Sequence, residues 1–378
     1  MRDKTYSATE IEQAKKKVSI VEMYKLNAVK ADEIKPANQP WLWQGYIPDE
    51  CCTLLAGRGG VGKSTMLAWI ASCVSTGKSF SLDGIEHHIP QGNILILAAE
   101  DHKQYSIVPR LIAAGADLSH IHIVDSAVDS KTQLRERLIC LDEDMHLLEQ
   151  ALNSIGNIRL IIIDPITAYL GRLRENYAAE IRSFILGLTR LAVRKRCAIV
   201  LNTHTRKTSD NDHASAIDSI MGSSAWTNTP RMIHLVTQDH EDETLFRFTT
   251  PKANVKRGAP LAYRLKPIFL QENEETIETS AIEWQANIIP ITPDEAVSRK
   301  LFDEKNAVQE AKEFILNSLA FGCKESSYMH AKAEQMGISS ATLKRARQQL
   351  NKSGSPIIIE KSLTDRRKDI WYLGVCTN

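Results

Sequence analysis

The sequence predicts an α/β fold with a mostly parallel sheet, followed by a small C-terminal winged helix-turn-helix domain. Short apolar runs of strand length alternate with helical patterns from about residue 41 to residue 290, which is typical of a parallel sheet covered on both faces. A glycine-rich segment, 57 to 65, stands between one such strand and the helical pattern that follows it. From about residue 304 the chain changes to three helical patterns and a hairpin-like pair of strands.

Length and composition exclude several classes of protein. The chain has 378 residues, of which 43% are hydrophobic and 25% are charged, an ordinary globular composition. No apolar run approaches the length of a bilayer span, and the first residues lack the apolar stretch of a signal peptide. Seven cysteines without a CxxC pair favour a reducing compartment over disulfides or zinc. We therefore expect a soluble, cytoplasmic protein without a membrane partner.

Residues 1–40 are predicted to be an N-terminal helical arm and linker. Residues 7 to 31 have an amphipathic helical pattern, and two prolines between residues 32 and 40 end it. The mixed charge of this segment suits a solvated helix face, and the alternative is an arm that packs on a neighbouring subunit.

Residues 41–290 are predicted to form the α/β domain. Strands are expected at 53 to 56, 93 to 98, 121 to 124, 160 to 163 and 198 to 202, and helices at 63 to 76, 102 to 115, 142 to 154 and 175 to 195. Further segments at 231 to 236, 244 to 250 and 261 to 266 suit antiparallel strands added at one edge of the sheet. Residues 291–303 are expected to be a linker.

Residues 304–378 are predicted to be the winged-helix domain. A turn and an N-cap at 336 to 339 precede the expected recognition helix, 341 to 350. No acidic residue occurs from 335 to 359, a window that contains Lys344, Arg345 and Arg347. These three side chains are candidate contacts to duplex DNA, but winged helices also dock proteins, and the sequence leaves both alternatives open.

The nine residues 57 to 65 form a P-loop, because they join an apolar strand to a helix with the required glycine and lysine spacing. Its glycines allow backbone N–H groups to turn toward phosphate oxygens, and Lys63 supplies positive charge to the β and γ phosphates. The Ser64 hydroxyl can ligate Mg²⁺. We expect ATP and Mg²⁺ as cofactors, bound by Gly57, Arg58, Gly59, Gly60, Val61, Gly62, Lys63, Ser64 and Thr65.

Two further carboxylates are candidates for the chemistry of hydrolysis. Asp164 follows the apolar run 160 to 163, as in a Walker-B strand, and is the second expected Mg²⁺ ligand. Many P-loop enzymes place a glutamate directly after this aspartate to orient the attacking water, whereas the next residue here is Pro165. Glu100, after the strand 93 to 98, can supply that base. The alternative role, capping the helix that follows, is the one we expect for Asp101.

These motifs, with the segments 202 to 207, 222 to 231 and 252 to 254, occur in the order seen in RepA-type hexameric helicases of plasmids and phages. From about residue 41 to residue 270 the chain resembles these RecA- and DnaB-like ATPases. The resemblance implies a RecA-like P-loop core and a homo-hexameric ring with ATP at the subunit interfaces.

The resemblance also implies roles for individual residues. Glu100 is the catalytic base, His204 senses the γ phosphate, Arg231 is a finger that acts on a neighbour's ATP, and Lys252 is a second cation at that interface. Many relatives have two histidines at the sensor position, whereas this chain has Thr203 before His204. Structural alternatives stay open: a hydrogen-bonded histidine, an arginine in a surface ion pair and a solvated lysine.

Two polar loops are candidates for binding single-stranded DNA in a central channel. The net charge of +1 means that any nucleic-acid surface must be local. One loop carries Arg172 and Arg174, and the other begins with Arg206 and Lys207. Basic loops of this kind suit a phosphate backbone, but they can equally be solvated surface.

We therefore expect an ATP-dependent, DNA-stimulated, ring-forming motor, a replicative DNA helicase, with a primase or another replication protein as a further partner. The alternative is a DNA-binding ATPase that acts as a loader or nucleotide-dependent regulator without unwinding DNA. A small-molecule kinase is disfavoured, because no acceptor-binding lid is evident and the C-terminal domain would be unexplained.

Overall fold

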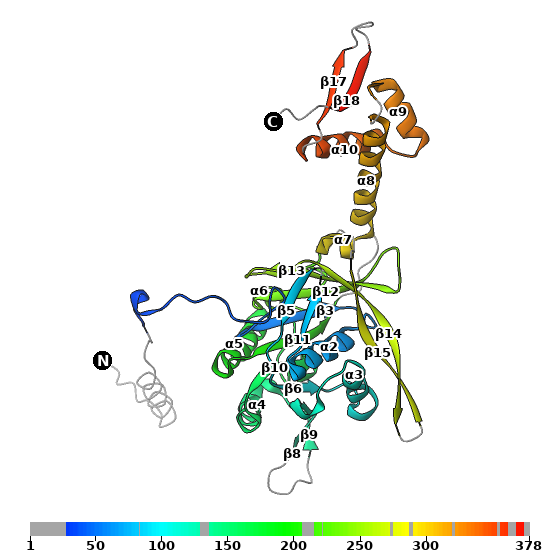
Figure 1. Cartoon of the computed structure of the whole chain (residues 1–378). Coiled ribbons are helices and arrows are strands. Elements are labelled where there is room, and N and C mark those ends of the chain that lie inside the picture. Colours follow the sequence, from blue (N-terminus) through cyan, green and yellow to red (C-terminus); the bar gives the residue numbers. More distant parts are fainter. Residues whose placement is uncertain are drawn as a thin grey trace, which may run out of the picture. The chain divides into compact units, whose positions relative to one another are not determined.

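The computed structural model describes residues 28–82, 84–128, 136–205, 215–220, 222–272, 275–286, 290–319, 322–353, 356–361 and 368–373 (Figure 1). The chain divides into two compact units, residues 1–39 and residues 40–378. Most of the predicted helix 7 to 31 lies outside the described residues, and the described part of the first unit contains one 3₁₀ turn, η1 (Ala31–Glu33). None of the described helices is both long enough and apolar enough to cross a membrane.

A nine-stranded sheet forms the framework of the second unit (Figure 1). Its strands are β3 (Cys52–Gly57), β6 (Asn93–Ala98), β7 (Ile121–Val124), β10 (Ile158–Asp164), β11 (Ala198–His204), β12 (Met232–Gln238), β13 (Leu245–Ala253), β14 (Leu261–Glu272) and β15 (Glu275–Gln285). Their order is β15-β14-β13-β12-β3-β11-β10-β6-β7. The six strands from β12 to β7 are parallel, and the other three are antiparallel. The predicted α/β class with a mostly parallel sheet is confirmed.

One expectation about the edge of the sheet was wrong, and one strand at this edge was not expected. The segment 231 to 236 was expected to be antiparallel, but β12 runs parallel to β3, with Met232 opposite Thr53. The chain between β11 and β12 returns to the edge where β3 begins, so β12 must run in the same direction. Strand β15 was not expected, because its alternating polar sequence contains no apolar run, yet it pairs with β14 along its whole length.

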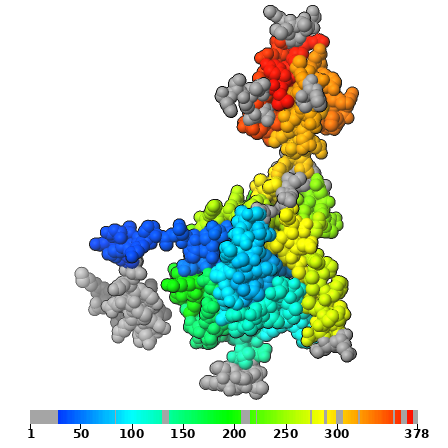
Figure 2. Space-filling view, viewed as in Figure 1, coloured from blue at the N-terminus to red at the C-terminus, as the bar shows by residue number. Residues whose placement is uncertain are grey.

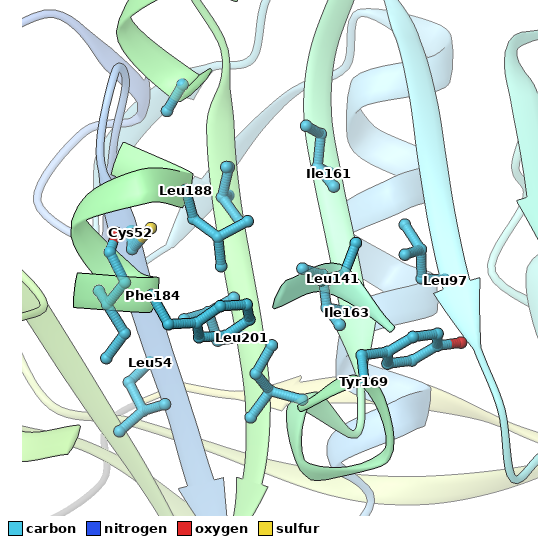
Figure 3. Close-up of a cluster of buried hydrophobic side chains, with 14 of the residues drawn as sticks. Cys52, Leu54, Leu97, Leu141, Ile161, Ile163, Tyr169, Phe184, Leu188 and Leu201 are labelled. Carbon is cyan, nitrogen blue, oxygen red and sulfur yellow. Dashed lines mark hydrogen bonds between the residues drawn. The ribbon is translucent and has the colours of Figure 1, made fainter. Parts of the chain in front are cut away.

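Helices cover both faces of the sheet. One face carries α2 (Lys63–Thr76), the π-helical turn η2 (Lys103–Ile107) and α3 (Val108–Ala113), and the other carries α4 (Leu141–Ile155) and α5 (Ala178–Lys195). Successive residues of a strand point to opposite faces, so Leu54 of β3 packs in the α4 and α5 core and Leu55 in the α2 core. Figure 3 shows the first core, in which Phe184 and Leu188 of α5 face the strands.

A long hairpin, β14–β15, extends beyond the sheet. Strand β13 pairs only with the first four residues of β14, and beyond Arg264 the hairpin packs on α2 and α3. In the space-filling view its yellow surface lies along one side of the core (Figure 2). Its base contacts the P-loop directly, because the Tyr263 hydroxyl donates to the carbonyl of Val61 at 2.8 Å. The hairpin therefore supports the P-loop from outside the parallel sheet.

Smaller elements complete this part of the chain. Three two-stranded sheets pair β1 (Trp41–Trp43) with β2 (Ile47–Pro48), β4 (Ser79–Leu82) with β5 (Ile85–His88), and β8 (Ala127–Val128) with β9 (Glu136–Arg137). The short helical turns are η3 (Leu118–His120), η4 (Ile166–Tyr169) and α6 (Ala225–Asn228).

The C-terminal residues form three helices and a small antiparallel sheet. The helices are α8 (Arg299–Leu319), α9 (Ser326–Gln335) and α10 (Ser340–Lys352), and the sheet has the order β16 (Lys324–Glu325), β18 (Asp369–Leu373), β17 (Ile357–Lys361). They share a core of their own, which includes Ile315, Leu343 and Trp371. Ser339 caps α10 by accepting a hydrogen bond from the Thr342 N–H, as its position before the predicted helix indicated.

The expected linker, 291–303, is largely helical. It contains α7 (Pro293–Val297) and the start of α8. A capping box between Thr292 and Glu295 starts α7, which the proline at the first helical position also favours. The Asp294 carboxylate accepts a hydrogen bond from the Ala216 N–H at 2.8 Å, which fixes α7 to the segment that follows β11.

Candidate functional site

The P-loop connects the C-terminal end of β3 to the first turn of α2. Gly60 and Gly62 have φ angles of +80° and +81°, a conformation that residues with a side chain rarely adopt. A Cβ atom at Gly57 would lie 2.7 Å from the carbonyl of Val236, so this position has no room for a side chain. The loop thus brings its backbone to the N-terminus of a 14-residue helix, where free N–H groups and the helix dipole favour an anion.

Lys63 is buried at the first position of α2. Its Nζ donates hydrogen bonds of 2.8 Å to the carbonyls of Gly57 and Arg58. Burial lowers the pKa of this ammonium group to about 8, against the opposing influence of Asp164 and Glu100. The positive charge of Lys63 is therefore maintained by its neighbours and by any anion held in the loop.

Ser64 and Asp164 form the candidate metal pair. The Ser64 hydroxyl donates to Oδ2 of Asp164 at 2.8 Å, and the Asn202 side-chain amide donates to the other carboxylate oxygen. A hydroxyl and a carboxylate are oxygen ligands of the kind that Mg²⁺ prefers, so these two side chains fit the expected ion. Sequence analysis assigned no role to Asn202, although a polar residue directly after the apolar residues of β11 was a usable signal.

Glu100 and His204 lie at the same edge of the sheet. Glu100 is an exposed residue shortly after β6, whose last residue pairs with Asp164, and it lies close enough to interact electrostatically with Lys63. His204 is half-buried at the end of β11, directly opposite Gly57. The carboxyl ends of parallel strands thus bring Lys63, Ser64, Glu100, Asp164 and His204 together.

The expectation that Asp101 caps the following helix was wrong. The helical segment begins after His102, which forms no side-chain cap. The Asp101 carboxylate is instead ion-paired with Arg110 of α3.

Comparison with protein families identifies the family to which the chain belongs. A family model described as an AAA domain matches residues 21–210. The chain belongs to this AAA domain family. A comparison with curated proteins found no match. Because the matched region contains the P-loop, Asp164 and Glu100, the chain has a P-loop ATPase domain. ATP binding and, as is usual in such domains, a divalent metal follow from the family.

The AAA domain match ends before Arg231 and Lys252. Both residues lie at the edge of the sheet where β3 begins, opposite the edge that carries the P-loop. The Arg231 N–H donates to the carbonyl of Cys52, at the start of β3, whereas the P-loop begins at its end. At about 3.3 Å per residue, the strand separates these two points by roughly 16 Å. Arg231 is exposed, so its guanidinium is open to solvent at this edge.

Lys252 contacts the segment that immediately precedes Arg231. Its Nζ donates to the carbonyls of Thr227, Asn228 and Pro230 at 2.7, 2.8 and 3.1 Å. Burial, followed by the positive charge of Arg231, lowers the pKa of Lys252. The ammonium group therefore secures the end of α6 immediately before Arg231.

The first candidate DNA-binding loop of the AAA domain has internal partners for its charges. Arg172 is 89% exposed and ion-paired with Glu143 at 3.3 Å. Arg174 donates to Glu180 through Nε at 3.0 Å, and its guanidinium lies 3.4 Å from the centroid of the Tyr177 ring. The second candidate loop, with Arg206 and Lys207, lies outside the described residues.

The three basic candidates on α10 differ in environment. Lys344 and Arg345 are exposed. Arg347 is half-buried, with its guanidinium 5.3 Å from the centroid of the Trp371 ring. A contact of this kind holds α10 to β18, so Arg347 has a structural partner within the C-terminal core.

Proposed function

We propose that the chain is the subunit of a ring-forming, DNA-stimulated motor, a replicative DNA helicase that hydrolyses ATP at its subunit interfaces. The AAA domain provides the P-loop ATPase. The observation that carries the further proposal is the position of Arg231, at the edge of the sheet opposite the P-loop of the same chain.

A cation at that distance cannot reach the nucleotide of its own subunit. Subunits that join head to tail bring opposite surfaces together, and such contacts close into rings. In a ring, the exposed Arg231 of one subunit would face the P-loop of the next. A guanidinium there would stabilise the charge that develops on the transferring phosphoryl group.

The other site residues then have separate tasks. Lys63 would bind the β and γ phosphates, Ser64 and Asp164 would hold Mg²⁺, and Mg²⁺ would neutralise phosphate charge when bound. Glu100 would orient the attacking water and accept its proton, and His204 would contact the γ phosphate. Lys252 would act through Arg231, because its ammonium group is engaged by the carbonyls that precede that residue.

DNA would bind at two places in this proposal. Loops that include Arg172, Arg174, Arg206 and Lys207 would contact single-stranded DNA in the channel. The three helices and antiparallel sheet at the C-terminus have the order of elements found in a winged helix, in which α10 would present Lys344 and Arg345 to duplex DNA.

The decisive experiment mixes two inactive subunits. Arg231→Ala should retain nucleotide binding but lose ATPase activity by a factor of about 10³ or more, the range for arginine fingers. Lys63→Ala should also be inactive, because it removes the charge that binds the phosphates. Mixtures should recover ATPase activity where an intact P-loop meets an intact Arg231.

Arg196→Ala is the matched control, because Arg196 is also exposed and immediately precedes the sheet edge where β11 begins. This variant should keep wild-type activity. If Arg231→Ala and Lys63→Ala assemble together and no mixing ratio restores ATPase activity, the shared interface is wrong.

The second candidate is an ATPase that loads or regulates other molecules on DNA without unwinding it. The ion pairs of Arg172 and Arg174 with Glu143 and Glu180 favour it, because these charges already have partners within the chain. Strand separation of a forked duplex, together with imaging of the protein with an ATP analogue and single-stranded DNA, distinguishes the two. Closed rings that unwind the fork support the helicase, and ATPase activity without rings or unwinding supports the regulator.

A further inference from the structure

A small cavity lies beside the candidate metal pair, between the sheet and the helices α2 and α3. Its polar lining consists of Ser64, Asp164, Asp101 and Arg110, and apolar side chains of α2, η2, α3, β6 and β10 form the remainder. Asp101 and Arg110, which both line this cavity, are ion-paired with each other. An arginine from α3 is thus placed close to the edge at which ATP hydrolysis is proposed.

The path of the chain gives this ion pair a specific effect. Strand β6 ends at Ala98, which is held in the sheet opposite Asp164. Glu100 follows two residues later, and Asp101 comes next, bonded to Arg110 on the far side of the η2 turn. Glu100 is therefore fixed on one side by the sheet and on the other by the Asp101 ion pair.

The conformation of the η2 turn indicates that the segment between β6 and α3 has a functional role. Residues 103–107 are π-helical, a conformation that is rare and is frequently found at functional sites. The turn is also tied to the chain after β7, because Lys103 forms a 2.8 Å ion pair with Asp125. The segment that carries Glu100 thus has fixed contacts at several points, although Glu100 itself is exposed.

Charge gives Arg110 a second effect on the same site. Asp101 lines the cavity together with Asp164 and Ser64, so an unpaired Asp101 carboxylate would compete for the metal or repel the phosphates. The guanidinium of Arg110 neutralises that carboxylate and directs it toward α3. The neighbouring Glu100 remains the carboxylate that can approach the attacking water.

We propose that Asp101 and Arg110 are positioning residues for ATP hydrolysis, which hold the Glu100 carboxylate in its working place. This inference rests on the proposed role of Glu100 as the water-orienting base. It predicts that loss of the ion pair lowers kcat without weakening the binding of ATP or Mg²⁺, because the P-loop and the Ser64–Asp164 pair are unchanged.

The test compares Arg110→Ala with its matched control, Arg264→Ala. Arg264 forms a similarly half-exposed arginine–aspartate pair, 2.6 Å from Asp242, on the hairpin β14–β15. Arg110→Ala should lower kcat about 10- to 100-fold, the cost of a misplaced catalytic group, while the Kd of a fluorescent ATP analogue changes less than about twofold. Arg264→Ala should leave both values at wild type. Arg110→Lys should restore part of kcat, because it keeps the charge.

Measuring Arg110→Ala in a Glu100→Gln background shows whether Arg110 positions Glu100 or only stabilises the fold. If Arg110 acts through Glu100, adding Arg110→Ala to Glu100→Gln should change the residual rate less than about twofold. An equal fall in both backgrounds, or a weaker Kd with unchanged kcat, would overturn the inference. Wild-type turnover by Glu100→Gln would instead remove the proposed base itself, so the two failures are distinguishable.

Discussion

Protonation of Lys63 should control nucleotide affinity just above neutral pH. The pKa of its ammonium group is lowered to about 8 by burial, so at pH 9 only about a tenth of the molecules carry the charge. Bound phosphates favour the protonated form of Lys63. At pH 9, ATP therefore binds mainly to the small fraction of molecules in which Lys63 is charged. The apparent Kd for ATP should therefore rise about tenfold between pH 7 and pH 9.

The assay is a titration with a fluorescent ATP analogue at fixed ionic strength, repeated from pH 7 to pH 9.5. Lys63→Arg should show a flat profile over this range, because arginine stays charged. Lys78→Met is the matched control, since Lys78 is exposed just beyond the opposite end of α2, and this variant should show the wild-type rise.

Unfolding does not explain the expected loss of affinity. The folded-state pKa of Lys63 lies below its ordinary value of 10.5, so the unfolded chain binds more protons between pH 8 and pH 10.5. The contribution of Lys63 to the free energy of unfolding consequently increases with pH in that window. A constant Kd from pH 7 to pH 9.5 in the wild-type protein would refute the assignment of this buried lysine to the phosphates.

Three further predictions concern other parts of the chain. Asn202→Ala should raise the Mg²⁺ concentration for half-maximal ATPase activity about tenfold, because it removes the amide that donates to the Asp164 carboxylate; an unchanged Mg²⁺ dependence would contradict this. Arg247→Leu should lower the free energy of unfolding, measured in urea, by about 3–5 kcal/mol, because it leaves the buried Asp239 carboxylate without its guanidinium partner. Lys344→Ala and Arg345→Ala should each reduce the slope of log affinity against log salt for duplex DNA by about one, and an unchanged slope would favour protein docking by α10.

The sequence alone determined the elements that depend on local patterns. Helix α2 and strand β6 were predicted with their observed bounds, and the P-loop was predicted between a strand and a helix, because glycine spacing and hydrophobic periodicity act within a few residues. The cap of α10 by Ser339 belongs to the same class, since Ser339 and the Thr342 N–H that donates to it lie three residues apart. The carboxylate of Asp164 was also identifiable, because an apolar strand ends at it.

The tertiary structure decided which distant residues meet. The contact of Asn202 with Asp164 requires β11 to lie beside β10, and the contact of Tyr263 with Val61 requires the hairpin to return across α2. Neither pairing has a local signal, since 38 and 202 residues separate the partners.

The placement of Arg231 likewise depends on the direction of β12, which the sequence did not reveal. A parallel strand beside β3 puts its first residues at the edge away from the P-loop, whereas an antiparallel strand would have put them beside it. Strand direction is fixed by how the chain crosses between strands and by the burial of both sheet faces, which are properties of the whole fold.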